Sequence, residues 1–251
     1  MTIRALLFDL WGTLLYIRDV DDMEARRRRL LDRTVVGLAN AGHPYAEETV
    51  AAALAEFGDE HSAMHRKGRD ISQPERLVLV LERIEPGLAS RMSGTALLAF
   101  EDAVADVRLR DRKDRTFPAP GALAAVEEAR GRGLALGLVS VTGLTPGYVL
   151  RDVLDGHGLL RHFEALTFSD EARMAKPAPE IFHCTLEVLA VEADEAVFIG
   201  DTPFADVAGP QALGMTAVQV GNRQEDGVTP DARIDSLEEL FPALQRLGLV
   251  D

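Results

Sequence analysis

The sequence predicts an α/β protein with a doubly wound parallel sheet and an inserted all-helical module. Two observations support this prediction. Short, almost continuous apolar segments alternate with helical patterns through the C-terminal half, as strands buried on both faces of a parallel sheet require. The segment from about residue 16 to residue 115 contains only helical patterns, and it interrupts the alternation after the first apolar segment.

Five apolar segments have the length and composition of buried strands. The predicted strands are Ile3–Phe8, Leu134–Ser140, Ala165–Phe168, Ala196–Gly200 and Thr216–Val220. Helical patterns lie between or beside the later strands, and they are Ala122–Arg132, Gly147–Leu154, Pro179–Ala190 and Phe204–Leu213. Repeated strand–helix–strand units imply right-handed crossovers, with helices on both faces of the sheet.

The inserted segment predicts four helices in a domain of their own. They are Met23–Ala41, Ala46–Lys67, Gln73–Glu85 and Ser90–Arg108, and glycine or proline follows each of the first three. Ser72 and Glu75 have the spacing of a capping box. The charged, proline-containing segment Asp111–Pro120 predicts a linker. We therefore expect a core of residues 1–15 and 116–251 and a helical cap domain of residues 16–115.

The composition argues against several classes of partner. With 27 Lys+Arg and 41 Asp+Glu, the net charge is −14, so neither nucleic acid nor an anionic membrane surface is the expected partner. No apolar run reaches the roughly 18 residues of a membrane span, and Asp9 and Gly12 interrupt the apolar N-terminus before a secretory signal could form. A single cysteine, Cys184, suits a reducing compartment. We expect a cytoplasmic protein acting on small molecules, and the oligomeric state stays open.

Polar side chains stand where several predicted strands end. Asp9 follows the first strand, Ser140 ends the second, and Asp201 follows the fourth, with Asp206 five residues later. Lys176 lies in the loop after the third strand. Ligands of open parallel sheets bind beyond the carboxyl ends of the strands. The sequence therefore predicts that carboxylates, a hydroxyl and a lysine meet at one edge of the sheet.

This set resembles the four motifs of the haloacid dehalogenase-like hydrolases, and the helical insertion lies where that family carries its type 1 cap. The resemblance implies a Rossmann-like fold and a nucleophilic Asp9. It also implies Mg²⁺ bound by Asp9, Asp201 and the backbone carbonyl of Trp11. Asp206 would lie next to these ligands without contacting the metal. Lys176 adds a fixed positive charge. A carboxylate can attack an anionic substrate only if cations cancel their repulsion, which explains these residue types.

The resemblance also implies a cradle for a small anionic substrate. Ser140 is expected to act in catalysis by holding oxygens of the transition state, together with N–H groups of its own turn at Val141 and Thr142. The loop Leu10–Gly12 adds further N–H groups, with the Trp11 side chain at the site. Gly12 permits a tight exit from the strand, and Thr13 is expected to hold the loop by a side-chain hydrogen bond.

Two positions depart from the phosphatase pattern. Trp11 stands where phosphatases carry a second aspartate, which protonates the leaving alcohol, and Val141 replaces a small polar residue. The leading prediction is a Mg²⁺-dependent phosphohydrolase, because Asp201 and Asp206 are kept. The alternatives are a 2-haloacid dehalogenase, a phosphonate hydrolase that forms a Schiff base on Lys67, and a catalytically degenerate member that binds an anion or a partner.

Two cap histidines carry a separate hypothesis. His61 and His65 are four residues apart on a predicted helix, a spacing that can bind zinc, but the sequence shows no third ligand. Either histidine could instead reach the active site and replace the missing acid.

Overall fold

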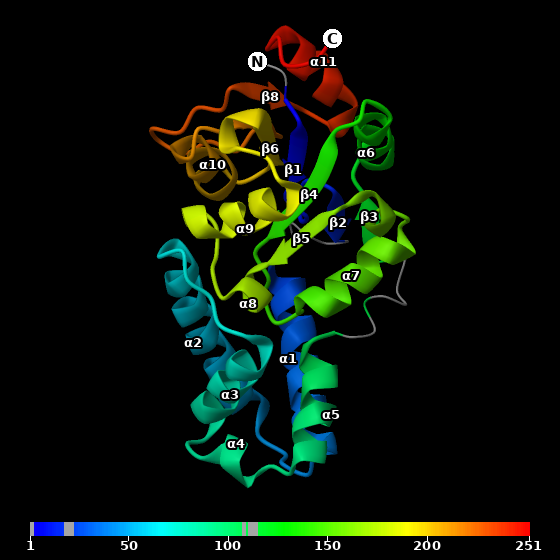
Figure 1. Cartoon of the computed structure of the whole chain (residues 1–251). Helices are drawn as coiled ribbons and strands as arrows, with labels where there is room; N and C mark the ends of the chain where they lie inside the picture. Colours follow the sequence, from blue (N-terminus) through cyan, green and yellow to red (C-terminus); the bar gives the residue numbers. More distant parts are fainter. Residues whose placement is uncertain (1–2, 18–22, 107–108, 110–114) are drawn as a thin grey trace.

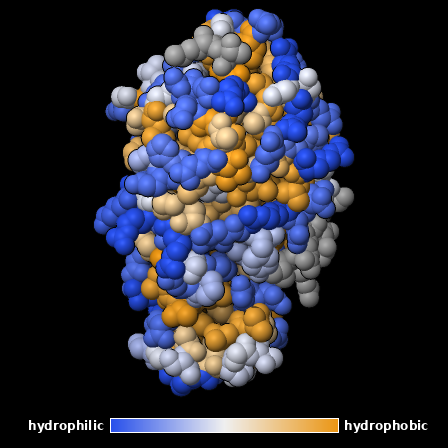
Figure 2. Space-filling model, in the orientation of Figure 1, coloured by the Kyte–Doolittle hydropathy of each residue, from blue (hydrophilic) through white to orange (hydrophobic). Residues whose placement is uncertain are grey.

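The computed structural model describes residues 3–17, 23–106, 109 and 115–251. An α/β part and a helical part lie end to end (Figure 1). Hydrophilic residues line much of the waist between them on the face in Figure 2, with hydrophobic residues above and below. None of the helices in the described ranges offers an apolar stretch that would reach across a bilayer.

The main sheet has six strands, all parallel, in the order β5-β4-β1-β6-β7-β8. The strands are β1 (Ala5–Phe8), β4 (Ala135–Ser140), β5 (Ala165–Phe168), β6 (Ala196–Gly200), β7 (Thr216–Val220) and β8 (Ala232–Ile234). The five predicted strands are confirmed. β8 was not predicted, because a three-residue strand with Arg233 at its centre leaves no apolar run.

Helices cover both faces of this sheet, as predicted. The helices of the α/β part are α6 (Ala122–Gly131), α7 (Gly147–Gly156), α8 (Ser169–Ala172), α9 (Pro179–Leu189), α10 (Gly209–Ala212) and α11 (Leu240–Arg246), with single 3₁₀ turns at Leu160–His162, Ala193–Glu195 and Leu237–Glu239. In β1, Leu6 and Phe8 join the core under α6, α7 and α11, whereas Ala5 and Leu7 join the core under α9. This alternation explains why β1 is apolar at every position.

The predicted helix Phe204–Leu213 has a different form. Residues Pro203–Ala208 form a π-helical segment, and the short α10 follows at once. Pro210 has no N–H to donate, so a regular α-helical ladder cannot run through it. The segment carries Asp206 close to the end of β6.

The helical module contains α1 (Met23–Asn40), α2 (Glu47–Arg66), α3 (Gln73–Ile84), α4 (Leu88–Arg91) and α5 (Gly94–Val104). The predicted single helix Ser90–Arg108 is wrong in its middle, because Ser93 caps a new helix by accepting the Ala96 N–H at 3.1 Å. At the start of α3, the Glu75 carboxylate accepts the N–H and the hydroxyl of Ser72. The module encloses its own apolar core.

The chain crosses between the two parts twice, and the strands at the two crossings form one small sheet. β2 (Leu15–Ile17) pairs antiparallel with β3 (Thr116–Pro118), and Leu15 faces Pro118. The predicted linker Asp111–Pro120 is therefore partly a strand, and its residues 111–114 lie outside the described ranges. We propose this strand pair as the boundary of the helical module.

A buried ion pair helps to hold the helical module against the α/β part. Arg76 and Asp70 approach to 2.6 Å, and neither side chain is exposed to solvent. Arg76 also donates to the carbonyl of Gly143, in the loop after β4. The Asp70 N–H donates to the Arg173 carbonyl at 3.2 Å. The pair thus joins α3 to two loops that lead to the sheet edge.

Replacing Arg76 by leucine is expected to destabilise the protein strongly, because it leaves the Asp70 carboxylate buried without its main cation. Loss of one partner of a buried ion pair costs about 3–5 kcal/mol. The free energy of unfolding in urea, measured for wild type and R76L, tests this.

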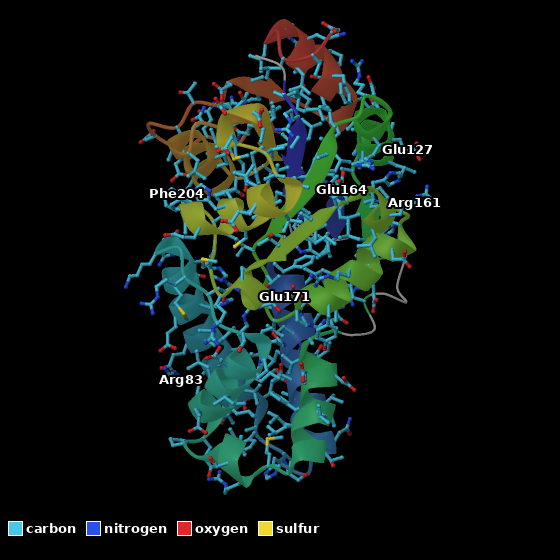
Figure 3. The ribbon with its side chains drawn as sticks, in the orientation of Figure 1. Arg83, Glu127, Arg161, Glu164, Glu171 and Phe204 are labelled. Atoms are coloured by element: carbon cyan, nitrogen blue, oxygen red, sulfur yellow. The ribbon has the colours of Figure 1, made fainter. Side chains whose placement is uncertain are left out.

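The matched control is Arg83→Gln on the same helix. Arg83 lies at the surface of the module (Figure 3), where it pairs with Glu56 and Glu60. Such surface pairs contribute about 0–1 kcal/mol. Equal losses in R76L and R83Q would show that the buried pair does not hold the module in place.

Candidate active site

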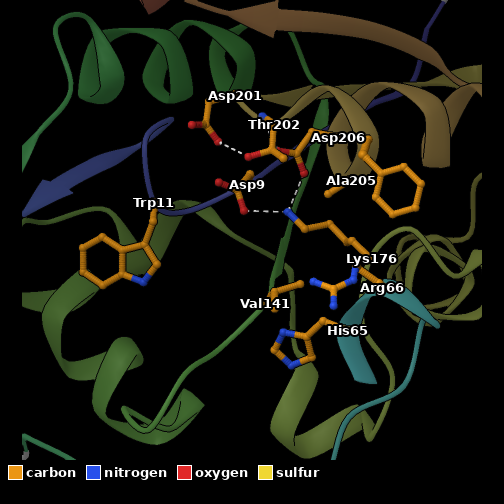
Figure 4. Close-up of a pocket in the computed structure, with 11 residues that line it drawn as sticks. Asp9, Trp11, His65, Arg66, Val141, Lys176, Asp201, Thr202, Ala205 and Asp206 are labelled. Atoms are coloured by element: carbon orange, nitrogen blue, oxygen red, sulfur yellow. Dashed lines mark hydrogen bonds and ion pairs between the residues drawn. The ribbon is translucent and has the colours of Figure 1, made fainter. Parts of the chain in front are cut away.

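Three carboxylates meet at the C-terminal edge of the sheet (Figure 4). Asp9 follows β1, Asp201 follows β6, and Asp206 lies in the π-helical segment. Each contributes one oxygen to a group in which all oxygens lie within 4.8 Å of one another. They meet because β1 and β6 are paired, and the Asp9 N–H continues the pairing by donating to Ile199 at 2.9 Å.

Lys176 bridges two of these carboxylates. Its Nζ lies 2.6 Å from Asp9 Oδ1 and 2.7 Å from Asp206 Oδ1, and its side chain is 3 % exposed. Burial lowers the pKa of Lys176, but the charges of Asp206 and Asp9 outweigh burial and hold the pKa above its ordinary value. The ammonium therefore stays charged.

Negative charge nevertheless exceeds positive charge at this edge. The pKa of Asp9 is raised to about 7, because burial and the charges of Asp206 and Asp201 outweigh the opposing effect of Lys176. Burial and the charge of Asp206 also raise the pKa of Asp201. A hard divalent cation with oxygen ligands relieves this kind of crowding, so the side chains present fit Mg²⁺.

Two glycines allow the carboxylates to approach the backbone. Gly12 has φ +82°, and a Cβ there would lie 2.6 Å from Asp201 Oδ2. A Cβ on Gly200 would lie 2.4 Å from the Asp206 Cβ. The N–H of Gly12 donates to the Leu15 carbonyl at 2.9 Å. Gly12 thus shapes the loop, and its N–H is not directed to a substrate as the sequence analysis expected.

The polar side chains expected around the substrate have different environments. Ser140 is fully buried, and its hydroxyl has no hydrogen-bond partner among the described residues. Thr142 holds its own loop instead, because its N–H donates to Ser169 Oγ at 2.8 Å and its hydroxyl to Asp170 at 3.0 Å. The Thr13 hydroxyl is buried and makes no hydrogen bond within the described ranges, so the expected loop bond is absent.

A cavity of about 310 Å³ opens beside the carboxylates. The α/β part lines it with Asp9, Trp11, Val141, Lys176, Asp201, Thr202, Phe204, Ala205 and Asp206. Helix α2 of the module adds His65 and Arg66 from the other side (Figure 4). The cavity therefore lies between the two parts, and the predicted Trp11 and Val141 form part of its wall.

Two cationic residues of this site were not predicted from the sequence. Arg223 follows β7, and its Nη1 lies 3.0 Å from Asp201 Oδ2 and 3.2 Å from the Thr202 hydroxyl. The strand-end rule, applied after Val220, would have found it. Arg66 lines the cavity, whereas its neighbour Lys67 is exposed and is not among the lining residues. The phosphonate hydrolase alternative needs Lys67 in the cavity to form a Schiff base, and Lys67 does not line it.

The expectation that the two cap histidines lack a third partner is wrong. His61 Nε2 lies 2.8 Å from Asp70 Oδ1, and His65 Nε2 lies 3.0 Å from Asp70 Oδ2. Burial raises the pKa of Asp70, but hydrogen bonds from both histidines and the charge of Arg76 outweigh it and hold the pKa well below its usual range. The three side chains have the ligand atoms of a possible metal site, and the Arg76 guanidinium already lies 2.6 Å from Asp70 Oδ2.

Comparisons with known proteins agree with this architecture. The family model of the haloacid dehalogenase-like hydrolases matches residues 3–214. A phosphoserine phosphatase of Thermus thermophilus is 40 % identical over 136 residues, which cover 53 % of this chain and 53 % of the relative, about half of its length. A glyceraldehyde 3-phosphate phosphatase of Methanopyrus kandleri is 27 % identical over 255 residues, covering 98 % of this chain and 99 % of the relative.

A solved structure shows the same fold. The 2-haloacid dehalogenase from Pseudomonas syringae pv. Tomato DC3000 superposes with a TM-score of 0.71 at 22 % identity, covering 98 % of this chain and all of that one (100 %). With a matching family model over most of its length, the chain belongs to the haloacid dehalogenase-like hydrolases.

Proposed function

We propose that this hydrolase removes phosphate from a small organic phosphate in a Mg²⁺-dependent reaction, through an aspartyl-phosphate on Asp9. The carboxylate cluster around Lys176 carries the proposal. Three buried or half-buried carboxylates favour a divalent cation, whereas a site that binds a haloacid without metal gains nothing from two additional negative charges. The two phosphatases among the relatives support the same activity.

The metal ligands in this proposal are Asp9, Asp201 and the backbone carbonyl of Trp11. Bound Mg²⁺ supplies positive charge that offsets the repulsion between the Asp9 carboxylate and the substrate phosphate. Asp206 does not need to touch the metal, because it holds the Lys176 ammonium at 2.7 Å and accepts the Thr202 N–H at 2.9 Å. This arrangement fixes Lys176 beside the nucleophile.

The chemistry has two displacements at phosphorus. A carboxylate oxygen of Asp9 forms a bond to phosphorus, and the bond to the leaving alcohol breaks. Water then attacks the phosphorus of the aspartyl-phosphate, which releases inorganic phosphate and restores Asp9. The Ser140 hydroxyl lies at the end of β4 without a partner in the described structure, and donation to a phosphoryl oxygen would satisfy it.

We assign the proton for the leaving alcohol to His65. Trp11 cannot supply it, because an indole N–H does not exchange a proton at neutral pH. His65 lines the cavity, and its Nε2 lies 3.0 Å from Asp70 Oδ2, a neighbour of the kind that catalytic imidazoles have in other hydrolases. His61 shares the same carboxylate but is not among the lining residues.

Asp9→Asn is expected to lower the kcat for phosphate ester hydrolysis by at least about 10³-fold, because the amide cannot attack phosphorus. Activity of wild type should also disappear in EDTA and return with added Mg²⁺. Release of inorganic phosphate from a panel of phosphate esters measures both effects.

The control is Asp155→Asn, which removes an exposed carboxylate of α7 and should leave activity unchanged. Chloride release from 2-chloropropionate in EDTA, abolished in D9N, would replace this proposal by the dehalogenase alternative. Inertness toward every ester, with Mg²⁺ binding intact, would favour the degenerate alternative.

His65→Gln is expected to lower kcat/KM for alkyl phosphates by about 10²–10⁴-fold, because an alkoxide needs a proton to leave. The loss for p-nitrophenyl phosphate should stay below about threefold, since its phenolate leaves without one. Steady-state kinetics on the two kinds of ester measure the split.

His61→Gln is the matched control, because it perturbs the same Asp70 carboxylate without touching the cavity. Equal losses in H61Q and H65Q on both esters would reduce His65 to a structural residue. Adding Trp11→Asp to H65Q should restore alkyl phosphate turnover, because it puts a carboxyl group at the position that phosphatases of this family use.

A further inference from the structure

Asp201 has a cationic neighbour of its own, in addition to the lysine that bridges the other two carboxylates. Arg223 Nη1 lies 3.0 Å from Asp201 Oδ2, whereas Lys176 contacts the other two. The Thr202 hydroxyl donates to the second oxygen, Asp201 Oδ1, at 3.0 Å (Figure 4). Both oxygens of this proposed metal ligand thus have a partner from the chain itself.

The backbone of Arg223 is held independently of its side chain. Gln219, in β7, is fully buried, and its amide donates to the Arg223 carbonyl at 2.8 Å. Gly221 turns the chain with φ +80°, and its N–H donates to the Ile234 carbonyl at 2.8 Å. Neither contact involves the guanidinium. The segment after β7 therefore keeps its place whether or not the arginine side chain moves.

The two partners of this ion pair differ in exposure. The side chain of Arg223 is 64 % exposed, whereas that of Asp201 is 16 % exposed. An exposed ion pair contributes little stability, because water solvates its charges and holding two side chains together costs conformational freedom. The guanidinium can therefore leave Asp201 for solvent at small cost. The carboxylate directly follows β6 and stays in the site.

Lys176 differs from Arg223 in this respect. Its side chain is buried and contacts two carboxylates at 2.6 and 2.7 Å. Among the described residues that contact the carboxylates, Lys176 is thus a fixed cation and Arg223 a movable one. Burial and the charge of Asp206 raise the pKa of Asp201, and Arg223 opposes them. Arg223 therefore helps to keep Asp201 ionised.

We propose that Arg223 is a counter-ion that leaves Asp201 when a divalent metal binds, and that it thereby lowers the metal affinity of the site. This inference rests on the proposed function, in which Asp201 is a metal ligand, and adds a residue that tunes this ligand. Two cations that use one carboxylate repel each other. Moving the guanidinium away therefore offsets part of the binding free energy of the metal.

The test measures metal affinity without any substrate. Mn²⁺ takes the same oxygen ligands as Mg²⁺, and the electron paramagnetic resonance signal of free Mn²⁺ reports how much is bound. The titration is run at about pH 8, above the pKa of about 7 of Asp9, because protons compete with metals for carboxylates. Arg223→Gln is expected to bind Mn²⁺ about three- to tenfold more tightly than wild type, as removal of an exposed competing charge predicts. Asp201→Asn should weaken the binding, which assigns the signal to this site.

Two further variants separate the ion pair from net charge. Arg246→Gln removes the same charge from the exposed end of α11, which lies at the end of the molecule opposite the helical module (Figure 1). R246Q should bind Mn²⁺ within about 1.5-fold of wild type, because salt at about 0.1 M screens charges more than about 10 Å apart. Arg223→Lys keeps a charge beside Asp201 and should stay within about twofold of wild type.

The outcomes distinguish this inference from the proposed function. Tighter Mn²⁺ binding in R223Q supports the inference even if no phosphate ester is hydrolysed, in which case the proposed function alone fails. Unchanged or weaker binding in R223Q would overturn the inference, because Arg223 would then only orient Asp201. Absence of binding in both wild type and R223Q would overturn the proposed metal ligands as well. The Gln219 contact to the Arg223 carbonyl remains in R223Q, and thermal unfolding without metal checks that its fold is intact.

Discussion

The ammonium of Lys176, held between Asp9 and Asp206, is the interaction on which the rest of the site depends. Without this cation, three carboxylates so close together in a buried place would take up protons rather than stay charged. The pKa of Asp9, raised to about 7 even with Lys176 present, shows how strong that tendency is. Two internal cations oppose this tendency: Lys176 lies between Asp9 and Asp206, and Arg223 lies 3.0 Å from Asp201.

The helical module contacts the segment that carries Lys176, although the two lie far apart in the sequence. Gly68, just after α2, accepts the Ala175 N–H at 3.0 Å, and Ala175 immediately precedes Lys176. Two residues further on, Asp70 is tied to the fully buried Arg76. A backbone hydrogen bond thus joins the segment that carries Asp70 and Arg76 to the segment that carries Lys176. The position of Lys176 therefore depends on contacts from both parts of the molecule.

The sequence was informative wherever short-range physics decides the structure. Apolar runs predicted five strands, and the rule that ligands gather at strand ends predicted that Asp9 and Asp201 meet at one edge of the sheet. The sequence did not predict hydrogen bonds and ion pairs between side chains that lie far apart along the chain. The engagement of Thr142 with Asp170, or of Asp70 with Arg76, depends on loops that meet only after packing. β8 and the β2–β3 pair carry too few residues for a periodic pattern to emerge.

The pairing of β2 with β3 allows the helical module to vary in evolution. Partners across an antiparallel pair have Cα atoms only about 5 Å apart, so the polypeptide leaves the sheet and returns to it at nearly the same point. A block of helices can then be lengthened, shortened or exchanged between lineages without shifting the register of any strand. The helical module is then free to diversify, while the α/β part that carries the carboxylate cluster keeps its geometry.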